Sequence, residues 1–234
     1  MATAPQQQAL ASLKDLLTSG DYSDLTITCG QGTYKVHKAI VCSRAGFFAL
    51  AVRFGGQEPK SGVVDLPGDE LEIVKFLVQY LYEADYNPVL PTDNQVKTTV
   101  AATPRVSCYS CEFCEAPSSP PPPPAGKAQQ LLLHAKMYET GDKYEVKGLK
   151  DLAKDKFEAS CKHFWNTSSF AVAARHAFST TIEDYKGLRN IVSATISEHL
   201  ELVDDPEVGA VMTEFNGLAL SILQATIGEQ GCKK

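Results

Sequence analysis

The sequence lacks the features of a membrane-spanning or nucleic-acid-binding protein. None of its apolar runs approaches the ~20 residues that a membrane-spanning helix requires. Lys and Arg number 22 against 28 Asp and Glu, a formal net charge of −6, so the chain has no excess of the basic side chains that phosphate contacts need. Residues 1–10 are polar and carry no basic stretch followed by an apolar core, which a secretory signal would have. We therefore predict an intracellular protein, in cytoplasm or nucleus, that binds neither membrane nor nucleic acid.

Signatures of common enzyme classes are also absent. The sequence contains no phosphate-binding loop, no Gly-x-Ser-x-Gly motif and no His-Glu-x-x-His motif. The segment 30–32 begins like a dinucleotide-binding fingerprint, but Lys35 stands where the third glycine is required. The five histidines do not cluster along the chain. We predict no catalytic residue, and therefore no enzyme, and no cofactor.

The seven cysteines are too few and too scattered for a disulfide framework, so we interpret them as reduced thiols. Three of them are separated by two-residue gaps, which would let their thiolates converge on one zinc ion. These candidate metal ligands are Cys108, Cys111 and Cys114. Zinc prefers four ligands, and the fourth could be Glu112, Glu115, His134 or a cysteine of a second subunit. The alternative, which we favour because only three thiols are present, is a set of exposed, redox-sensitive cysteines.

Proline is concentrated in one segment. Nine of the 13 prolines fall between about residues 87 and 127, and five of these are consecutive, at 120–124. A proline run fixes φ, removes amide donors and favours an extended polyproline helix. Few apolar residues in this segment could offset the entropy of ordering it. We predict a flexible Pro/Cys-rich insert between two folded pieces.

Before the insert, the apolar pattern predicts both helices and strands. Four leucines recur on one helical face, and Gly20 follows them as a helix stop; they are Leu10, Leu13, Leu16 and Leu17. Residues 25–29 and 33–37 alternate in polarity around a glycine-rich turn, which predicts a β-hairpin. Residues 63–66 form a third short strand. Asp69, with Glu72 three residues later, resembles a capping box that opens a helix with apolar residues from 71 to 81.

After the insert, the spacing predicts only helices. Apolar faces recur over residues 131–138, 149–157, 170–177 and 188–203. Asp205 followed by Pro206 predicts the start of a last helix, whose apolar residues run from 208 to 222. A hairpin and one more strand cannot cover so many helices. The fold class is therefore α+β, mainly helical, with a small sheet.

The order of these segments resembles the BTB/POZ domain. The matching stretches are 23–27, 34–43, 47–48, 63–66 and 74–86, then 132–138, 141–144, 148–149 and 152–153. Among BTB proteins, the sequence is most similar in its motif order to the single-domain BTB proteins of filamentous fungi. The resemblance implies an N-terminal helix (1–20) and a BTB/POZ domain (21–163) with a three-stranded sheet, interrupted by the insert. A C-terminal helical extension (164–228) and a disordered tail (229–234) follow.

The resemblance further implies a non-catalytic, protein-docking homodimer built on the N-terminal helix. Leu10, Leu13, Leu16 and Leu17 would then pack against a second copy; the alternative is that they pack on their own domain. The family also has a buried charged pair near its dimer interface. Asp24 matches the acidic member, and Lys38, next to His37, matches the basic one. The alternative is a solvated carboxylate and a lysine without a partner.

Many BTB proteins recruit cullin-type ubiquitin ligases through a hydrophobic residue, any residue, and then glutamate. The matching place here is Gly56-Gln57-Glu58, so the glutamate is present and the hydrophobic anchor is missing, with Phe54 displaced by two positions. The candidate partner-binding residues are Phe54, Gln57 and Glu58. A cullin adaptor is thus an alternative function, with a metal- or redox-responsive regulator as another. Helices in 167–228 could supply the missing contact.

Overall fold

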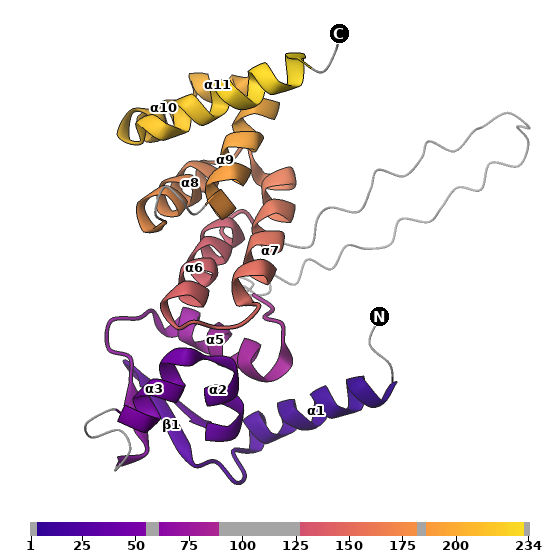
Figure 1. The fold of residues 1–234 in the computed structure, drawn as a ribbon, viewed down its shortest axis with the longest axis vertical. Helices are drawn as coiled ribbons and strands as arrows, with labels where there is room; N and C mark the ends of the chain where they lie inside the picture. Colours follow the sequence, from indigo (N-terminus) through magenta and orange to yellow (C-terminus); the bar gives the residue numbers. More distant parts are fainter. Residues whose placement is uncertain (1–3, 55–60, 89–126, 182–185, 232–234) are drawn as a thin grey trace, which may run out of the picture.

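The structure is a computed structural model that describes residues 4–54, 61–88, 127–181 and 186–231. Gln57, Glu58, the cysteines at 108, 111 and 114 and nearly all of the predicted insert lie outside these residues. The described part forms an elongated molecule with a small sheet domain at one end and stacked helices leading to the other (Figure 1).

The sheet has three strands in the order β2-β1-β3. Strands β1 (Leu25–Cys29) and β2 (Gly32–Val36) are antiparallel, with Leu25 opposite Val36 and Cys29 opposite Gly32. Strand β3 (Val63–Asp65) lies parallel to β1 on its other side. Because parallel strands need a crossover, the chain passes through α2 (Lys38–Arg44) and α3 (Gly46–Phe54) between β2 and β3. The predicted hairpin and third strand are confirmed.

Two further helices belong to the sheet domain, α1 (Ala4–Ser19) and α5 (Leu71–Glu83). Helix α5 begins where the sequence predicts, but the predicted capping box is wrong, since no side chain caps this helix. The Asp69 carboxylate instead accepts hydrogen bonds from Lys143 Nζ, at 2.8 Å, and from the Tyr144 hydroxyl, at 2.6 Å. The Asp69 carboxylate therefore binds side chains some 70 positions away instead of the backbone N–H groups at the start of α5.

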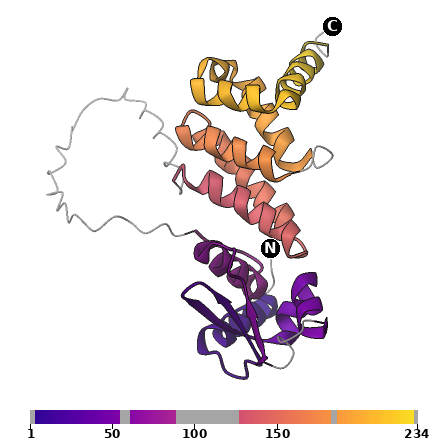
Figure 2. The same cartoon turned by 90° about the vertical axis from the view of Figure 1, so that its left-hand side faces the viewer.

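The remaining helices are arranged as successive pairs (Figure 2). They are α6 (Gln130–Lys143), α7 (Leu149–Phe164), α8 (Ser168–Thr180), α9 (Lys186–Glu198), the 3₁₀ helix η1 (Leu200–Asp204), α10 (Pro206–Glu214) and α11 (Asn216–Gly231). Asp205 caps α10 as predicted, accepting from the backbone N–H of Glu207 at 2.8 Å. Two predicted helices are each divided. The fourth ends at Glu198, and the last is broken at Phe215, whose backbone leaves the helical region (φ −119°, ψ 85°).

The first helical pair is joined to the sheet domain by backbone pairing and by a buried polar contact. Ala45, between α2 and α3, forms an isolated β-bridge with Val146, between α6 and α7. The Tyr86 hydroxyl bonds His134 Nδ1 at 2.9 Å in the interior. Burial, aided by the nearby Lys156 ammonium, lowers the pKa of His134 to about 4, so the ring is neutral at physiological pH. These contacts fix α6 and α7 against the sheet domain.

The two ends of the insert are held close together. Gln130 Nε2 donates to the Pro88 carbonyl at 3.1 Å. Lys156 Nζ donates to Asp85 Oδ1 and to the Tyr86 carbonyl, both at 2.6 Å. The chain therefore leaves and re-enters the folded part at neighbouring points.

Replacing residues 90–125 with a short Gly/Ser linker should leave the fold intact. The ends already lie side by side, and the free energy of closing a loop changes slowly with its length, by about 0.6 kcal/mol for each doubling. Thermal unfolding of the shortened and full chains should give midpoints within a few degrees of each other. An insoluble shortened chain, or one that melts far lower, would show that the insert contributes to the core.

Candidate interaction surface

Helix α1 projects from the sheet domain (Figure 1), and its two halves differ in how far they are buried. Its C-terminal half rests on α5, where Leu13 and Leu17 pack against the core and Lys14 Nζ lies 3.4 Å from Glu83 Oε2. Leu16 is half-buried. Residues 4–12 are all exposed, including Leu10 at 38%. The domain thus covers the second half of the leucine face, as the self-packing alternative predicts, and leaves the first half open. Packing against a second copy stays a prediction.

Gly20 ends α1 in the left-handed conformation (φ +69°), as predicted. Two residues later Tyr22 is also left-handed (φ +61°), and its side chain is 91% exposed. A positive φ is costly for a bulky side chain, so surrounding contacts must hold this turn. The Asp21 carbonyl supplies one, because it lies 2.7 Å from His37 Nε2.

His37 joins this turn to α5. Its backbone N–H donates to the Tyr82 hydroxyl at 2.8 Å, and its Nδ1 lies 2.7 Å from the same oxygen. With Nε2–H donating to Asp21, Nδ1 is the acceptor for the Tyr82 proton, and burial raises the pKa of Tyr82 so that this proton is retained. Both ring nitrogens are satisfied within one chain. His37 therefore holds the base of α1 in place and is itself buried, at 8% exposure.

Asp24 and Lys38 lie beside this joint, but not as a side-chain ion pair. Asp24 Oδ1 accepts from the backbone N–H of Lys38 at 2.7 Å, at the first turn of α2, where a carboxylate is favoured. The Asp24 side chain is exposed and that of Lys38 half-buried. In the single chain the carboxylate thus caps α2 at the surface.

A second exposed apolar feature lies on α3. Phe54 is 74% exposed and Leu50 54%, one turn apart and therefore on one face of the helix. The Arg53 guanidinium lies 6.0 Å from the Phe54 ring centroid. On the opposite side of α3, Phe48 is fully buried. The sequence predicts Phe54 as a partner-binding residue. The structure shows that it is exposed together with Leu50, which the four-residue spacing could have indicated.

Comparison with models of known protein families assigns the sheet domain to a family. Residues 13–103 match the model of the BTB/POZ domain. The chain contains a BTB/POZ domain. None of the curated proteins compared with the chain matches it. The match begins within α1 and ends inside the predicted insert, so the assignment of the helices up to residue 163 to the same domain stays a prediction.

The BTB/POZ domain is a protein–protein interaction module. Burial raises the pKa of the thiols Cys29 and Cys42, and raises that of Cys161, in α7, to about 12. These thiols are therefore protonated and poorly nucleophilic at neutral pH. Within the residues that the structure describes, no three His, Cys, Asp or Glu side chains gather in a way that could hold a metal ion. Nor does any described helix combine the length and apolar content needed to cross a bilayer.

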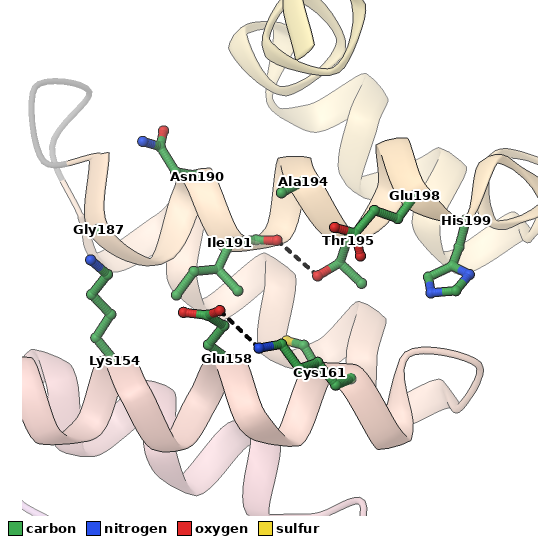
Figure 3. Close-up of a pocket in the computed structure, with 11 residues that line it drawn as sticks. Lys154, Glu158, Cys161, Gly187, Asn190, Ile191, Ala194, Thr195, Glu198 and His199 are labelled. Atoms are coloured by element: carbon green, nitrogen blue, oxygen red, sulfur yellow. Dashed lines mark hydrogen bonds and ion pairs between the residues drawn. The ribbon is translucent and has the colours of Figure 1, made fainter. Parts of the chain in front are cut away.

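Outside the BTB/POZ match, a cavity of about 440 Å³ lies between α7 and α9. Glu158 and Cys161 on α7 face Ile191 and Thr195 on α9 (Figure 3). Its polar groups engage one another: the Thr195 hydroxyl donates to the Ile191 carbonyl at 2.8 Å, and Glu158 pairs with Lys162 at 3.1 Å. At one end the His199 ring stacks on Trp165, with centroids 3.7 Å apart. Charges of both signs line the cavity, so it favours no one class of ligand.

Proposed function

We propose that two copies of this chain pair through α1, and that the resulting dimer is a non-catalytic docking platform for other proteins. The observation that carries the proposal is the open half of α1. Nine helical residues, 4–12, extend from the BTB/POZ domain with none of their side chains buried. An isolated helix of this length is marginal in water, so packing against a second copy would stabilise it.

The leucine face gives this contact its geometry. Leu10, Leu13 and Leu17 follow each other at helical spacing, and the last two already pack on the domain. A second copy related by a twofold axis would continue the same apolar strip over Leu10, because an isologous interface apposes identical surfaces. Leu16 lies at the edge of this strip. The interface would thus extend a surface that the domain has already begun to bury.

Asp24, His37 and Lys38 support this surface from its base. The His37 ring bonds only within its own chain, so its role is to position the α1–β1 turn. If the dimer buried the Asp24 carboxylate, the cost of desolvating it would require a cationic partner. Lys38, whose backbone N–H already donates to this carboxylate, is the candidate. We assign these residues to orienting α1 rather than to forming the apolar contact.

The mass of the purified chain in solution tests the proposal. Sedimentation equilibrium at micromolar concentration should give about twice the 25.4 kDa of one chain. A mass of one chain up to the highest soluble concentration would contradict it.

A second candidate function, an adaptor for a cullin-type ubiquitin ligase, is supported by the ridge of Leu50 and Phe54 on α3. Two apolar side chains that are both more than half exposed on one helix face suit an apolar pocket on a partner. Phe54 lies before the segment that contains Glu58, so an anchor displaced toward α3 would replace the residue missing at position 56. The dimer and the adaptor are compatible, since α1 and α3 are separate elements.

If this second function is right, Phe54→Ala should weaken binding to a purified cullin N-terminal domain about 10- to 100-fold. Burying one large apolar side chain contributes about 1.5–3 kcal/mol. The measurement is a titration by biolayer interferometry. Val172→Ala is the matched control, because Val172 lies on α8 and is similarly exposed, at 50%. An unchanged chain that binds more weakly than high micromolar would remove the adaptor function.

A further inference from the structure

Helix α11 is apolar on two opposite sides. Leu218 and Ile222 are buried where α11 packs on α9, and Ser197 Oγ on α9 bonds the Ile222 carbonyl at 3.5 Å. Leu220 and Leu223 lie away from this contact and are each 56% exposed. Helical spacing places Leu220 and Leu223 on the side of α11 opposite Leu218 and Ile222.

The position of α11 makes this exposure unusual. It lies with α10 at the end of the helical stack farthest from the sheet domain (Figure 1). In stacked helical arrays each pair is covered by the next, and an end helix needs a polar outer face. A helix that is apolar all round is normally buried. The outer face of α11 therefore has the character of an interface.

The charge of this segment indicates what covers it. Residues 216–228 contain no Asp, Glu, Lys or Arg, whereas the chain as a whole carries a net charge of −6. A strongly charged partner would find no complementary charge on this segment. Two copies of the same segment can meet without like-charge repulsion, which the acidic remainder of the chain would otherwise impose.

The small side chains of α11 fit close packing of two helices. A Cβ atom added at Gly217 would meet nothing within 4 Å, so this position fronts open space. Gly217 and Ala219 flank Leu220 and are both exposed. Small residues beside a large one leave a hollow into which the leucine of a facing helix can insert.

We propose that the outer face of α11 binds the α11 of a second copy across a twofold axis. Leu220 and Leu223 are the apolar contacts, and Gly217 and Ala219 allow the helices to approach. This contact does not depend on α1. If the dimer proposed above also forms, the two self-contacts lie on opposite ends of the chain and link dimers into longer assemblies. Because each end-to-end contact is between separate dimers, the longer assemblies should form only as the protein concentration rises.

Sedimentation velocity over a concentration series of the full chain tests the proposal. The unchanged chain should exceed the mass of a dimer as concentration rises, whereas Leu220→Glu should stop at about twice 25.4 kDa. Leu223→Glu should have the same effect. Val172→Glu is the control, because it places the same charge on a similarly exposed side chain of α8 and should behave as the unchanged chain. Circular dichroism should show the same helical signal in all four proteins.

A second substitution separates this proposal from the α1 dimer. Combined with a charged residue on the α1 face, Leu220→Glu should give a monomer, whereas the α1 substitution alone should still leave dimers formed through α11. If the unchanged chain stays a dimer at every concentration and Leu220→Glu changes nothing, the α11 contact is refuted and the α1 dimer stands. If Leu220→Glu alone gives a monomer, α11 self-association stands and the α1 dimer fails.

Discussion

Leu10→Asp should weaken the α1-mediated dimer at least 100-fold. Leu10 is the exposed leucine of the α1 face, and in the proposed dimer the second copy removes it from water. An aspartate there would be buried without a partner, which costs several kcal/mol. A 100-fold change in the dissociation constant corresponds to about 2.7 kcal/mol, and the twofold axis applies the penalty twice. Sedimentation equilibrium in the Leu220→Glu background, where α11 cannot contribute, measures this change directly.

Leu10 isolates dimerisation from folding better than its neighbours do. Leu13 and Leu17 pack against the core of their own chain, so a charge at either would also destabilise the fold. Ala11→Asp is the matched control, because residue 11 is exposed and lies on the side of the helix away from the leucine face. It adds the same charge to the same helix and should leave the mass unchanged. An equal effect of both substitutions would show that charge on α1, and not burial of Leu10, governs association.

Tyr82→Phe should lower the free energy of unfolding by about 2–4 kcal/mol. The lost hydroxyl accepts from the His37 backbone N–H and donates to His37 Nδ1, and Tyr82 is fully buried. Both groups of His37 would remain buried without a partner, at about 1–3 kcal/mol each. Urea unfolding followed by circular dichroism gives the change in midpoint.

Tyr34→Phe is the matched control, because it also removes a tyrosine hydroxyl, but one that makes little contribution to the packing of the domain. The Tyr34 hydroxyl makes one long contact, 3.4 Å from the Leu71 carbonyl, at the surface. Its loss should change the free energy of unfolding by no more than about 0.5 kcal/mol. Equal effects at the two tyrosines would mean that the His37 joint does not stabilise the domain in the way described above.

Local patterns in the sequence predicted the elements of the fold well. The alternation of Leu25, Ile27 and Cys29 is the buried face of β1, and Gly20 and Asp205 mark helix ends because their preferences act within a few residues. Patterns that depend on distant partners were predicted less well. Asp69 has the spacing of a capping box, but Lys143 and Tyr144 are brought to it only by the folded chain. No local signal carries that information.

In the interaction surface, too, features set by local spacing were predicted from the sequence, and features set by distant residues were not. Helical spacing correctly predicted that the leucines of α1 share one face. Which of them pack on their own domain depends on the position of α5, which local spacing does not give. In the structure Leu13 and Leu17 pack on the core, and Leu10 is exposed. His37 is adjacent to Lys38 in sequence, but its buried role follows from Tyr82, 45 positions away. Helical spacing places Leu220 and Leu223 opposite Leu218 and Ile222, but only the structure shows which of the two sides is buried.

Hydrogen–deuterium exchange of α1 tests the central claim most directly, in the Leu220→Glu chain so that only α1 can pair. The amides of residues 8–12 lie in the open half of α1 and make intrahelical hydrogen bonds. If a second copy covers this half, these amides should exchange more slowly as the protein concentration is raised, in step with the increase in mass. Amides of α5, buried within one chain, should not change. Exchange of residues 8–12 that does not change with concentration, with the mass of one chain throughout, would contradict the account.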